Sequence, residues 1–248
     1  MLLKIGITER GDAGIDFSWY DKLDTVDGAI IITKKLSDAF IDKLLTASKP
    51  VILHCSCTGW GGTWLEPNNP SYKDQLSLLS KLIQKGFPAE NIVLRIDPIF
   101  PTEEGIAKAC AVLDHVIAEK LPISRFRISI YDEYNHSRQR IIASGHPAFY
   151  GGSFYASQEM IKNTIDALKK YPFMFETCAE DFLSSRSIRF ISAGCIGRRD
   201  LAIMGLAIPN DMTENPQNRK GCHCLGCKTE LLERRAQCPN GCLYCYWK

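Results

Sequence analysis

Short apolar runs alternate along this chain with longer segments in which apolar residues recur at helical spacing. The short runs are rich in β-branched residues and predict seven strands, at residues 4–8, 28–33, 50–55, 91–97, 125–131, 173–178 and 190–193. The longer segments predict helices at residues 37–47, 72–86, 103–119 and 157–170. Strands that alternate with helices in this way are typical of a parallel sheet joined by crossover helices.

The predicted fold class is therefore α/β. Seven strands, and an eighth that Leu231–Ala236 would supply, favour a partial or permuted β/α (TIM-like) barrel, with a doubly wound open sheet as the competing architecture. An irregular polar stretch, Pro209–Gly221, follows the last predicted strand. It divides the chain into a barrel-like domain at residues 1–208 and a cysteine-rich tail at residues 209–248, which we expect to pack on the barrel mouth.

Composition changes this picture mainly through cysteine. The chain of 248 residues holds 11 cysteines, and six of them lie between Cys222 and Cys245. No apolar run reaches the roughly 20 residues that span a bilayer, so we expect a cytoplasmic protein without a membrane partner. In a reducing compartment, closely spaced cysteines are more often metal ligands than disulfide partners. A net charge of +2 indicates no strong attraction to nucleic acid.

The spacing C-x3-C-x2-C at Cys238, Cys242 and Cys245 lets one short loop present three thiolates to one metal centre. It leaves a fourth corner of an iron-sulfur cube open to a substrate or cofactor. Zinc is the alternative, with Cys224-x2-Cys227 and Cys242-x2-Cys245 as two knuckles. These two knuckles would supply all four zinc ligands and leave Cys238 without a role, which counts against zinc.

Polar residues gather where the predicted strands end, and parallel sheets bind ligands beyond these carboxyl ends. Asp97, Asp132 and Glu176 are the candidate catalytic groups, since carboxylates there can serve as acid or base. Arg10 and Arg95 are candidates for holding a cofactor. A lone histidine such as His54 is interpreted as a hydrogen-bonded structural residue.

The cysteines outside the tail divide into two kinds. Cys178 and Cys195 follow predicted strands, so they are either metal ligands or structural thiols. Cys55 and Cys57 are interpreted as structural, and Cys110 lies on the apolar stripe of a predicted helix.

Cys238, Cys242 and Cys245, with Tyr244 just before the third cysteine, resemble the C-x3-C-x-aromatic-C motif of the radical S-adenosylmethionine (SAM) enzymes. In that superfamily the three cysteines bind a 4Fe-4S cluster whose fourth iron chelates SAM, and an electron from the cluster cleaves SAM to a 5′-deoxyadenosyl radical. The resemblance implies SAM as a cofactor, with the Tyr244 ring near its adenine. The superfamily motif normally follows the first barrel strand, so a C-terminal motif implies a permuted arrangement.

Beyond the motif, the whole chain resembles a family of functionally uncharacterised bacterial proteins with a radical-SAM-like cysteine cluster at the C-terminus. The likeness rests on Arg10 with Asp12, Thr33-Lys34, Arg95-Ile96-Asp97-Pro98, Asp132 with Tyr134, Cys178-Ala179-Glu180, Cys195-Ile196, Arg219-Lys220-Gly221-Cys222 leading to Cys224, and the final segment from Cys238 to Tyr246. It implies that Cys178, Cys195, Cys222 and Cys224 close a second, fully ligated centre. That centre is a second 4Fe-4S cluster or, alternatively, a zinc ion, and Cys227 is left outside it.

These patterns predict an iron-sulfur protein that is a radical-SAM-like enzyme, with a small-molecule or macromolecular substrate and a reductant such as flavodoxin or ferredoxin. One alternative is an electron-transfer or binding protein that does not cleave SAM. Another is a zinc-stabilised nucleic-acid-binding or repair-related module, favoured by Arg234, Arg235, Tyr244, Tyr246 and Trp247, which can combine phosphate contacts with base stacking.

Overall fold

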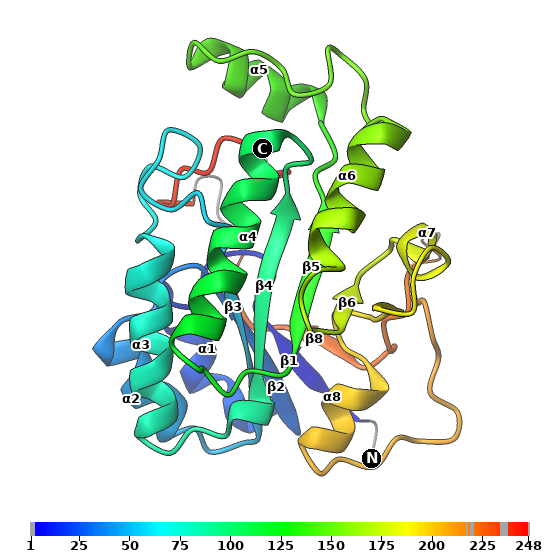
Figure 1. The fold of residues 1–248 in the computed structure, drawn as a ribbon. Coiled ribbons are helices and arrows are strands. Elements are labelled where there is room, and N and C mark those ends of the chain that lie inside the picture. The colour runs from blue at the N-terminus through cyan, green and yellow to red at the C-terminus, as the bar shows by residue number, and fades with distance from the viewer. Residues whose placement is uncertain (1–2, 217, 219–220, 234–237, 248) are drawn as a thin grey trace.

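One parallel β-sheet organises the molecule (Figure 1). The computed structural model describes residues 3–216, 218, 221–233 and 238–247. Within them the strands are β1 (Ile5–Ile7), β2 (Gly28–Thr33), β3 (Val51–Ser56), β4 (Ile92–Ile99), β5 (Phe126–Ile130), β6 (Phe175–Thr177), β7 (Phe190–Ser192) and β8 (Lys228–Glu230). Every neighbouring pair is parallel, in the order β7-β6-β5-β4-β3-β2-β1-β8. In the described part of the chain β7 and β8 do not pair, so the sheet stays open there.

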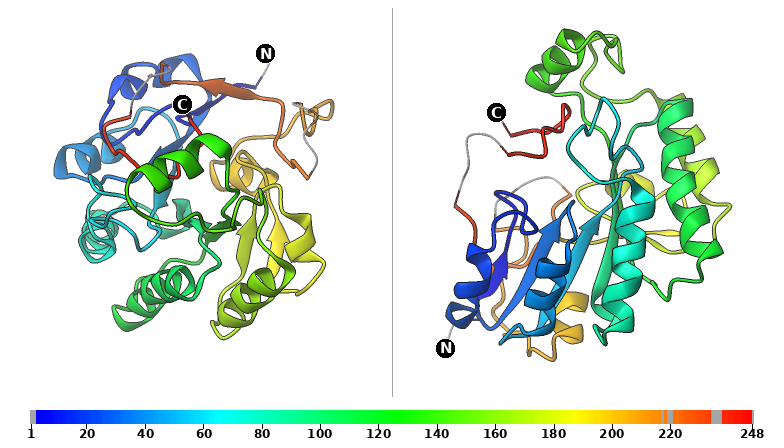
Figure 2. Two further views of the ribbon diagram at one scale, coloured as in Figure 1. Left: turned by 90° about the horizontal axis from the view of Figure 1, so that it is seen from above. Right: turned by 90° about the vertical axis from the view of Figure 1, so that its left-hand side faces the viewer.

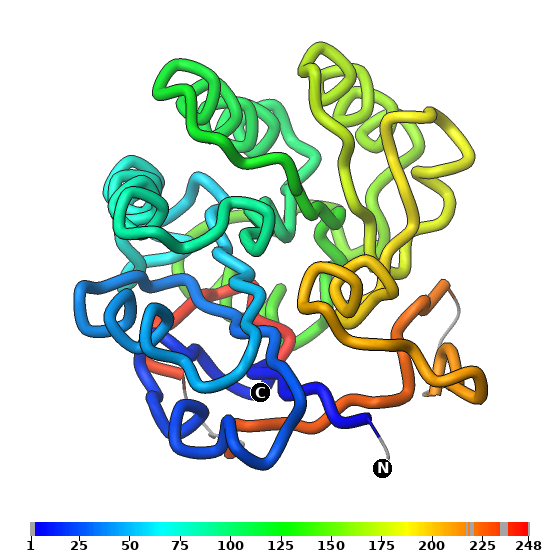
Figure 3. The backbone as a smooth tube through the Cα atoms, turned by 90° about the horizontal axis from the view of Figure 1, so that it is seen from below, coloured from blue at the N-terminus to red at the C-terminus, as the bar shows by residue number. Residues whose placement is uncertain are grey.

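Helices connect the strands and surround the curved sheet, as the view from above in Figure 2 and the backbone trace in Figure 3 show. They are α1 (Ser18–Asp21), α2 (Asp38–Leu45), α3 (Tyr72–Gln84), α4 (Glu103–Ala118), α5 (Asn135–Ala143), α6 (Gln158–Leu168), α7 (Asp181–Ser184) and α8 (Arg198–Ile203), with 3-10 turns at Leu23–Thr25 and Ala89–Asn91. Four of them, α2, α3, α4 and α6, begin at a serine or threonine whose side chain accepts a first-turn backbone N–H. Such caps satisfy donors that a helix start leaves unpaired.

The two faces of the sheet have different partners, because successive side chains of a strand point to opposite faces. One face carries residues such as Ile31, Leu53 and Leu94 and packs against α2, α3, α4 and α6 in the larger apolar core. The other face carries Ile7, Ile30, Ile52 and Val93, which pack against Leu201 of α8 and against Leu225. Burial on both faces is typical of a parallel sheet.

This second face changes from apolar to ionic toward the carboxyl ends of the strands. Arg95, Arg127 and Glu176 occupy neighbouring register positions on β4, β5 and β6. Their side chains share a face with Val93, two residues before Arg95. The thiol of Cys178 continues the same row two residues beyond Glu176. The strand order therefore places the charged row of Arg95, Arg127 and Glu176, followed by the Cys178 thiol, at one end of the sheet.

The α/β class is confirmed, whereas closure into a barrel stays a prediction. The seven predicted strands all form, and the four predicted helices form within two residues of their expected starts. The eighth strand was expected at Leu231–Ala236 but lies at Lys228–Glu230, and residues 234–236 lie outside the described part. β8 comes from the segment after residue 208 and pairs with β1; the division of the chain into two domains stays a prediction.

Candidate functional site

The tail segment from Cys238 to Trp247 lies at the carboxyl ends of the strands, below α5 in Figure 1. Two neighbouring parts of the chain hold it through its backbone. Arg140 of α5 donates to the carbonyl oxygens of Leu243 (2.9 Å) and Trp247 (3.3 Å), and also to that of Cys245. The loop after β3 supplies the Leu65 carbonyl, which accepts from the Leu243 N–H at 3.1 Å. The segment is therefore held on two sides by contacts that do not depend on a metal.

A buried polar network lies directly under this segment. Glu66 accepts from Lys34 Nζ at 3.1 Å and Thr58 Oγ1 at 2.7 Å, and it also accepts from the Tyr244 hydroxyl. Burial alone would raise the pKa of Glu66, but the Lys34 ammonium and these donors outweigh it and lower the pKa. Burial opposes the charge of Lys34 too, yet Glu66 keeps the pKa of Lys34 raised. The pair is thus charged inside the protein.

This network reaches the cysteine motif through Asn69. Its side-chain nitrogen lies 3.3 Å from Glu66 Oε2 and 3.2 Å from the sulfur of Cys242. Burial raises the pKa of the Cys242 thiol to about 12, while Lys34 acts to lower it. Cys242 therefore lies beside a cation and an N–H donor, the two groups that stabilise a thiolate.

A second contact fixes the turn between Cys238 and Cys242. Asn240 is buried, and its Nδ2 donates to Asp12 Oδ2 at 2.6 Å. Asp12 also accepts from the backbone N–H groups of Gly14 and Lys34, both at 2.9 Å, and from Thr33 Oγ1. The first half of the motif is thus tied to the ends of β1 and β2, and Cys238 is exposed beside them.

Four other thiols gather at the same end of the sheet. The sulfur atoms of Cys178 and Cys195 are 3.7 Å apart, and the Cys195 N–H lies 3.1 Å from the sulfur of Cys224. The Cys224 thiol in turn interacts with the thiols of Cys195 and Cys222. The four cysteines thus form a chain of contacts, drawn from the ends of β6 and β7 and from the segment before β8. Cys227 is buried in the apolar core and takes no part.

No set of three or more His, Cys, Asp or Glu side chains within the described ranges is already arranged around a common metal position. The four thiols touch in sequence rather than surrounding one point. Arg95, Arg127 and Lys228 all lie close enough to Cys195 for its thiolate charge to raise their pKa values. Three cations thus face the thiol that a metal would keep deprotonated.

The candidate carboxylates occupy three different environments. Asp97 accepts from Arg95 Nε at 3.1 Å and from Ser129; burial would raise its pKa, but Arg95 and Ser129 lower it. Glu176 is 2 % exposed and bound by arginines. Asp132 is half-buried just after β5.

The residues predicted to bind a cofactor also lie in different surroundings. Arg95 is committed to Asp97, whereas Arg10 is exposed near Glu230. The Tyr244 ring is 7 % exposed and packs edge-on against Phe100, with a ring separation of 5.3 Å. Tyr246 is 52 % exposed. Burial of its hydroxyl end, then the negative charges of Glu9, Cys245 and Cys195, raise its pKa. Tyr246 therefore lies within electrostatic range of one thiol from each group.

Some sequence interpretations need correction or lie outside the described residues. His54 is fully buried, but neither ring nitrogen has a hydrogen-bond partner among the described residues, contrary to the hydrogen-bonded role expected for it. Burial, followed by Arg127 and Arg95, lowers its pKa well below the usual value. Cys55 and Cys57 are buried core thiols, as expected. Arg219, Lys220, Arg234 and Arg235 lie outside the described residues.

Sequence reasoning missed Glu66, Asn69, Arg125 and Arg140. The signal for Arg125 was present, since Arg125 and Arg127 alternate with Phe126 in a predicted strand, residues 125–131, that is mostly apolar. Two arginines on a buried sheet face require carboxylate partners. Glu66 and Asn69 carry no such signal, because they belong to an irregular loop whose position depends on the whole fold.

Comparison with known proteins adds a family. No curated protein matches the chain. Among solved structures it is similar to the endoglucanase Cel5A of Pseudomonas stutzeri, with 14% sequence identity over 71% of this chain and 75% of that chain; the TM-score of 0.30 carries no argument about fold or function. None of the helices in the described ranges has the length and apolarity to cross a membrane. A family model described as a domain of unknown function, DUF1848, matches residues 18–247, so the chain belongs to that family.

Proposed function

We propose that this protein is a radical-SAM-like enzyme, in which Cys238, Cys242 and Cys245 hold an open 4Fe-4S cluster and Cys178, Cys195, Cys222 and Cys224 hold a second metal. The observation that carries the proposal is the anchoring of the tail. A terminal segment with three cysteines is held at the carboxyl ends of parallel strands, where ligand sites of such sheets lie. The same end holds four further thiols.

The donor set at the tail fits an iron-sulfur cluster. Thiolates are the ligands of such clusters, and hydrogen bonds and nearby charge set their potential. Asn69 supplies an N–H to the Cys242 sulfur, and Lys34 supplies a buried positive charge. When bound, the cluster supplies the electron that cleaves SAM. The chain's own part is to hold the three thiols at the sheet end and to keep a cation beside them.

The spacing of one thiol pair supports a single tetrahedral ion rather than a cube at the second centre. A metal–sulfur bond of about 2.3 Å at tetrahedral corners separates two sulfurs by about 3.8 Å. The sulfurs of Cys178 and Cys195 are 3.7 Å apart. Cysteines at different corners of a 4Fe-4S cube are further apart, because irons and sulfides separate them. We therefore assign zinc to this centre, with a structural role that ties the segment before β8 to the ends of β6 and β7.

Metal analysis tests the two assignments separately. Protein purified without oxygen should hold about four irons and four acid-labile sulfides in the tail cluster and about one zinc. Cys242→Ala should lose the iron and keep the zinc, whereas Cys224→Ala should lose the zinc. Cys227→Ala is the matched control and should keep both metals. About eight irons without zinc would replace zinc by a second cluster, and zinc without iron or sulfide would overturn the tail assignment.

SAM cleavage tests the enzymatic part. Dithionite-reduced protein should change its EPR spectrum on addition of SAM and should form 5′-deoxyadenosine and methionine. Cys238→Ala should abolish both results, whereas Cys227→Ala should retain them. A fully reduced cluster that gives neither response would favour the electron-transfer alternative, with a flavodoxin or ferredoxin as partner. The stacking role in the nucleic-acid alternative has less support, because the Tyr244 ring is buried.

A further inference from the structure

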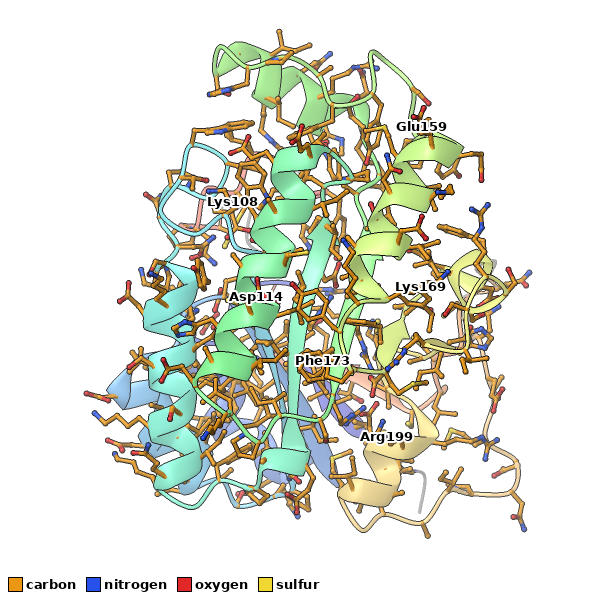
Figure 4. The ribbon with its side chains drawn as sticks, viewed as in Figure 1. Lys108, Asp114, Glu159, Lys169, Phe173 and Arg199 are labelled. Carbon is orange, nitrogen blue, oxygen red and sulfur yellow. The ribbon has the colours of Figure 1, made fainter. Side chains whose placement is uncertain are left out.

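A pocket lined by several charged side chains opens between β7 and the segment that precedes β8, beside α8. Its volume is about 280 Å³. One ordered water needs roughly 10–15 Å³ of such space. The pocket therefore has room for a ligand of several heavy atoms. Its floor includes Arg125, Arg127 and Glu176, and its rim includes Arg198 and Arg199 at the start of α8. Arg199 is labelled on that helix in Figure 4.

Two arginines form the floor of this pocket, and both are 2 % exposed. Arg125 donates from Nε to Glu176 Oε1 at 2.8 Å, and from Nη2 to Glu176 Oε2 at 3.2 Å and to Asp200 Oδ1 at 2.7 Å. Arg127 donates from Nη2 to Glu176 Oε2 at 2.6 Å. Burying two guanidinium groups this deeply requires acceptors for their N–H groups.

The buried carboxylates of Glu176 and Asp200 are fully engaged, whereas some buried arginine donors are not. Both oxygens of Glu176 accept from arginines, and Asp200 Oδ2 accepts the Gly197 N–H at 2.7 Å. Arg125 Nη1 and Arg127 Nε are buried and have no hydrogen-bond partner among the described residues. An unpaired buried donor destabilises the protein, because it has lost its hydrogen bonds to water. The buried groups of this pocket therefore include more hydrogen-bond donors than available acceptors.

The charges around the pocket leave a positive excess. The positive charges of Arg125 and Arg127 balance those of Glu176 and Asp200 on the floor. At the rim, Arg198 pairs with Glu214 at 2.8 Å, while Arg199 adds a cation that is half exposed and 3.4 Å from Glu176. The set of four arginines and three carboxylates is thus one positive charge in excess.

We propose that this pocket binds a small oxyanion, the phosphate or carboxylate group of a ligand, between the floor arginines Arg125 and Arg127 and the rim arginine Arg199. An oxyanion supplies only acceptors, which the unpaired N–H groups require, and a planar guanidinium binds it through paired hydrogen bonds. The pocket also touches Gly194 and His223, which neighbour Cys195, Cys222 and Cys224. The ligand would bind next to the four-thiol group. The proposal does not depend on whether that group holds a metal.

Phosphate and acetate titrations test the proposal on the protein as purified, with chloride at equal ionic strength as the reference. Calorimetry should give saturable binding of inorganic phosphate, and phosphate should raise the melting temperature more than chloride does. Saturable binding of acetate alone would identify a carboxylate site and would also support the proposal. If neither anion binds beyond the chloride reference, the donors are satisfied by water alone and the proposal fails.

Rim variants keep the test independent of folding, because Arg199 is exposed enough to be replaced without opening the core. Arg199→Ala should weaken anion binding roughly tenfold, the change expected for losing one hydrogen bond to a charged group. Arg186→Ala is the matched control, since Arg186 is exposed and contacts Gln158 outside the pocket. It should leave the affinity unchanged. Equal affinities in wild type and Arg199→Ala would place the anion elsewhere and overturn the assignment.

Discussion

Replacing Glu176 by Gln removes one charge from the most deeply buried ionic group of the sheet. Glu176 accepts from Arg125 and Arg127, and all three side chains are almost completely buried. Gln has nearly the same shape as Glu. It keeps one acceptor but turns an N–H₂ group toward a guanidinium that is itself only a donor. The substitution therefore leaves two arginines with one neighbouring carboxylate, that of Asp200.

The expected loss of folding stability follows from this uncompensated positive charge. Removing one partner of a buried ion pair costs about 3–5 kcal/mol, because the remaining charge stays buried without compensation. In a domain of this size each kcal/mol lowers the melting temperature by about 2–4 °C, so the decrease should be about 6–20 °C. Arg199 Nη1 lies 3.4 Å from Glu176 Oε1 but is half exposed, so this ion pair contributes little to the expected loss of stability.

The acid dependence gives a second signature. Burial would raise the pKa of Glu176, but Arg127 and Arg125 outweigh it and lower the pKa below the ordinary value of 4.5. A carboxyl whose folded-state pKa is lowered stabilises the protein above its unfolded pKa, and this stability is lost as the pH falls through the folded pKa. Glu176→Gln lacks that contribution. The unfolding free energies of the two proteins should differ by a constant amount above pH 4.5, and the difference should shrink as the pH falls through the lowered pKa of Glu176.

Anaerobic urea unfolding, followed by circular dichroism at several pH values, measures both effects. Asp166→Asn is the matched control, because Asp166 forms an exposed ion pair with Lys162 and should show no measurable change. Unchanged stability together with lost activity would refute the reasoning. Glu176 would then be a catalytic group, the role that its place near a strand end predicts.

Three further changes test the site. Tyr244→Phe removes the hydroxyl that donates to Glu66 and should cost about 1–2 kcal/mol in chemical unfolding, since a buried charged acceptor loses a donor; no loss would mean that Glu66 is satisfied without it. Arg140→Ala should speed hydrogen exchange at residues 238–247 and leave the sheet protected; unchanged exchange would show that the other contacts suffice. Cys227→Ser should retain bound metal but lower the melting temperature, because a hydroxyl replaces a buried thiol, whereas Cys224→Ser should lose one metal ion; equal metal loss in both would contradict the separation of these thiols.

Sequence patterns predicted the sheet well because most strands are buried on both faces and therefore appear as continuous apolar runs. They misplaced β8 for the opposite reason. β8 consists of Lys228, Thr229 and Glu230, and Lys228 pairs with Glu9 instead of entering an apolar core. An edge strand of three polar residues has no hydrophobic signal, and only the facing β1 identifies it.

The candidate site likewise has features that the sequence predicted and features that it could not predict. The spacing of the tail cysteines is a local property, so it was visible in the sequence. The approach of Cys178 to Cys195 also follows from strand order, since both thiols end adjacent strands. Lys34 with Glu66 could not be paired from the sequence, because the residues are 32 positions apart and one lies in an irregular loop. Charged pairs of this kind depend on the complete fold and therefore cannot be predicted from local sequence.

The pairing of β8 with β1 has a consequence for biosynthesis. Residues 5–7 pair with residues 228–230, so one edge of β1 has no strand to bind until more than two hundred further residues have been made. An unpaired strand edge in a nascent chain is a template for pairing with other chains, and contacts this distant in sequence form slowly. The ribosome therefore releases β8 more than two hundred residues after β1. Early release or truncation before residue 228 should yield aggregates rather than a smaller native domain.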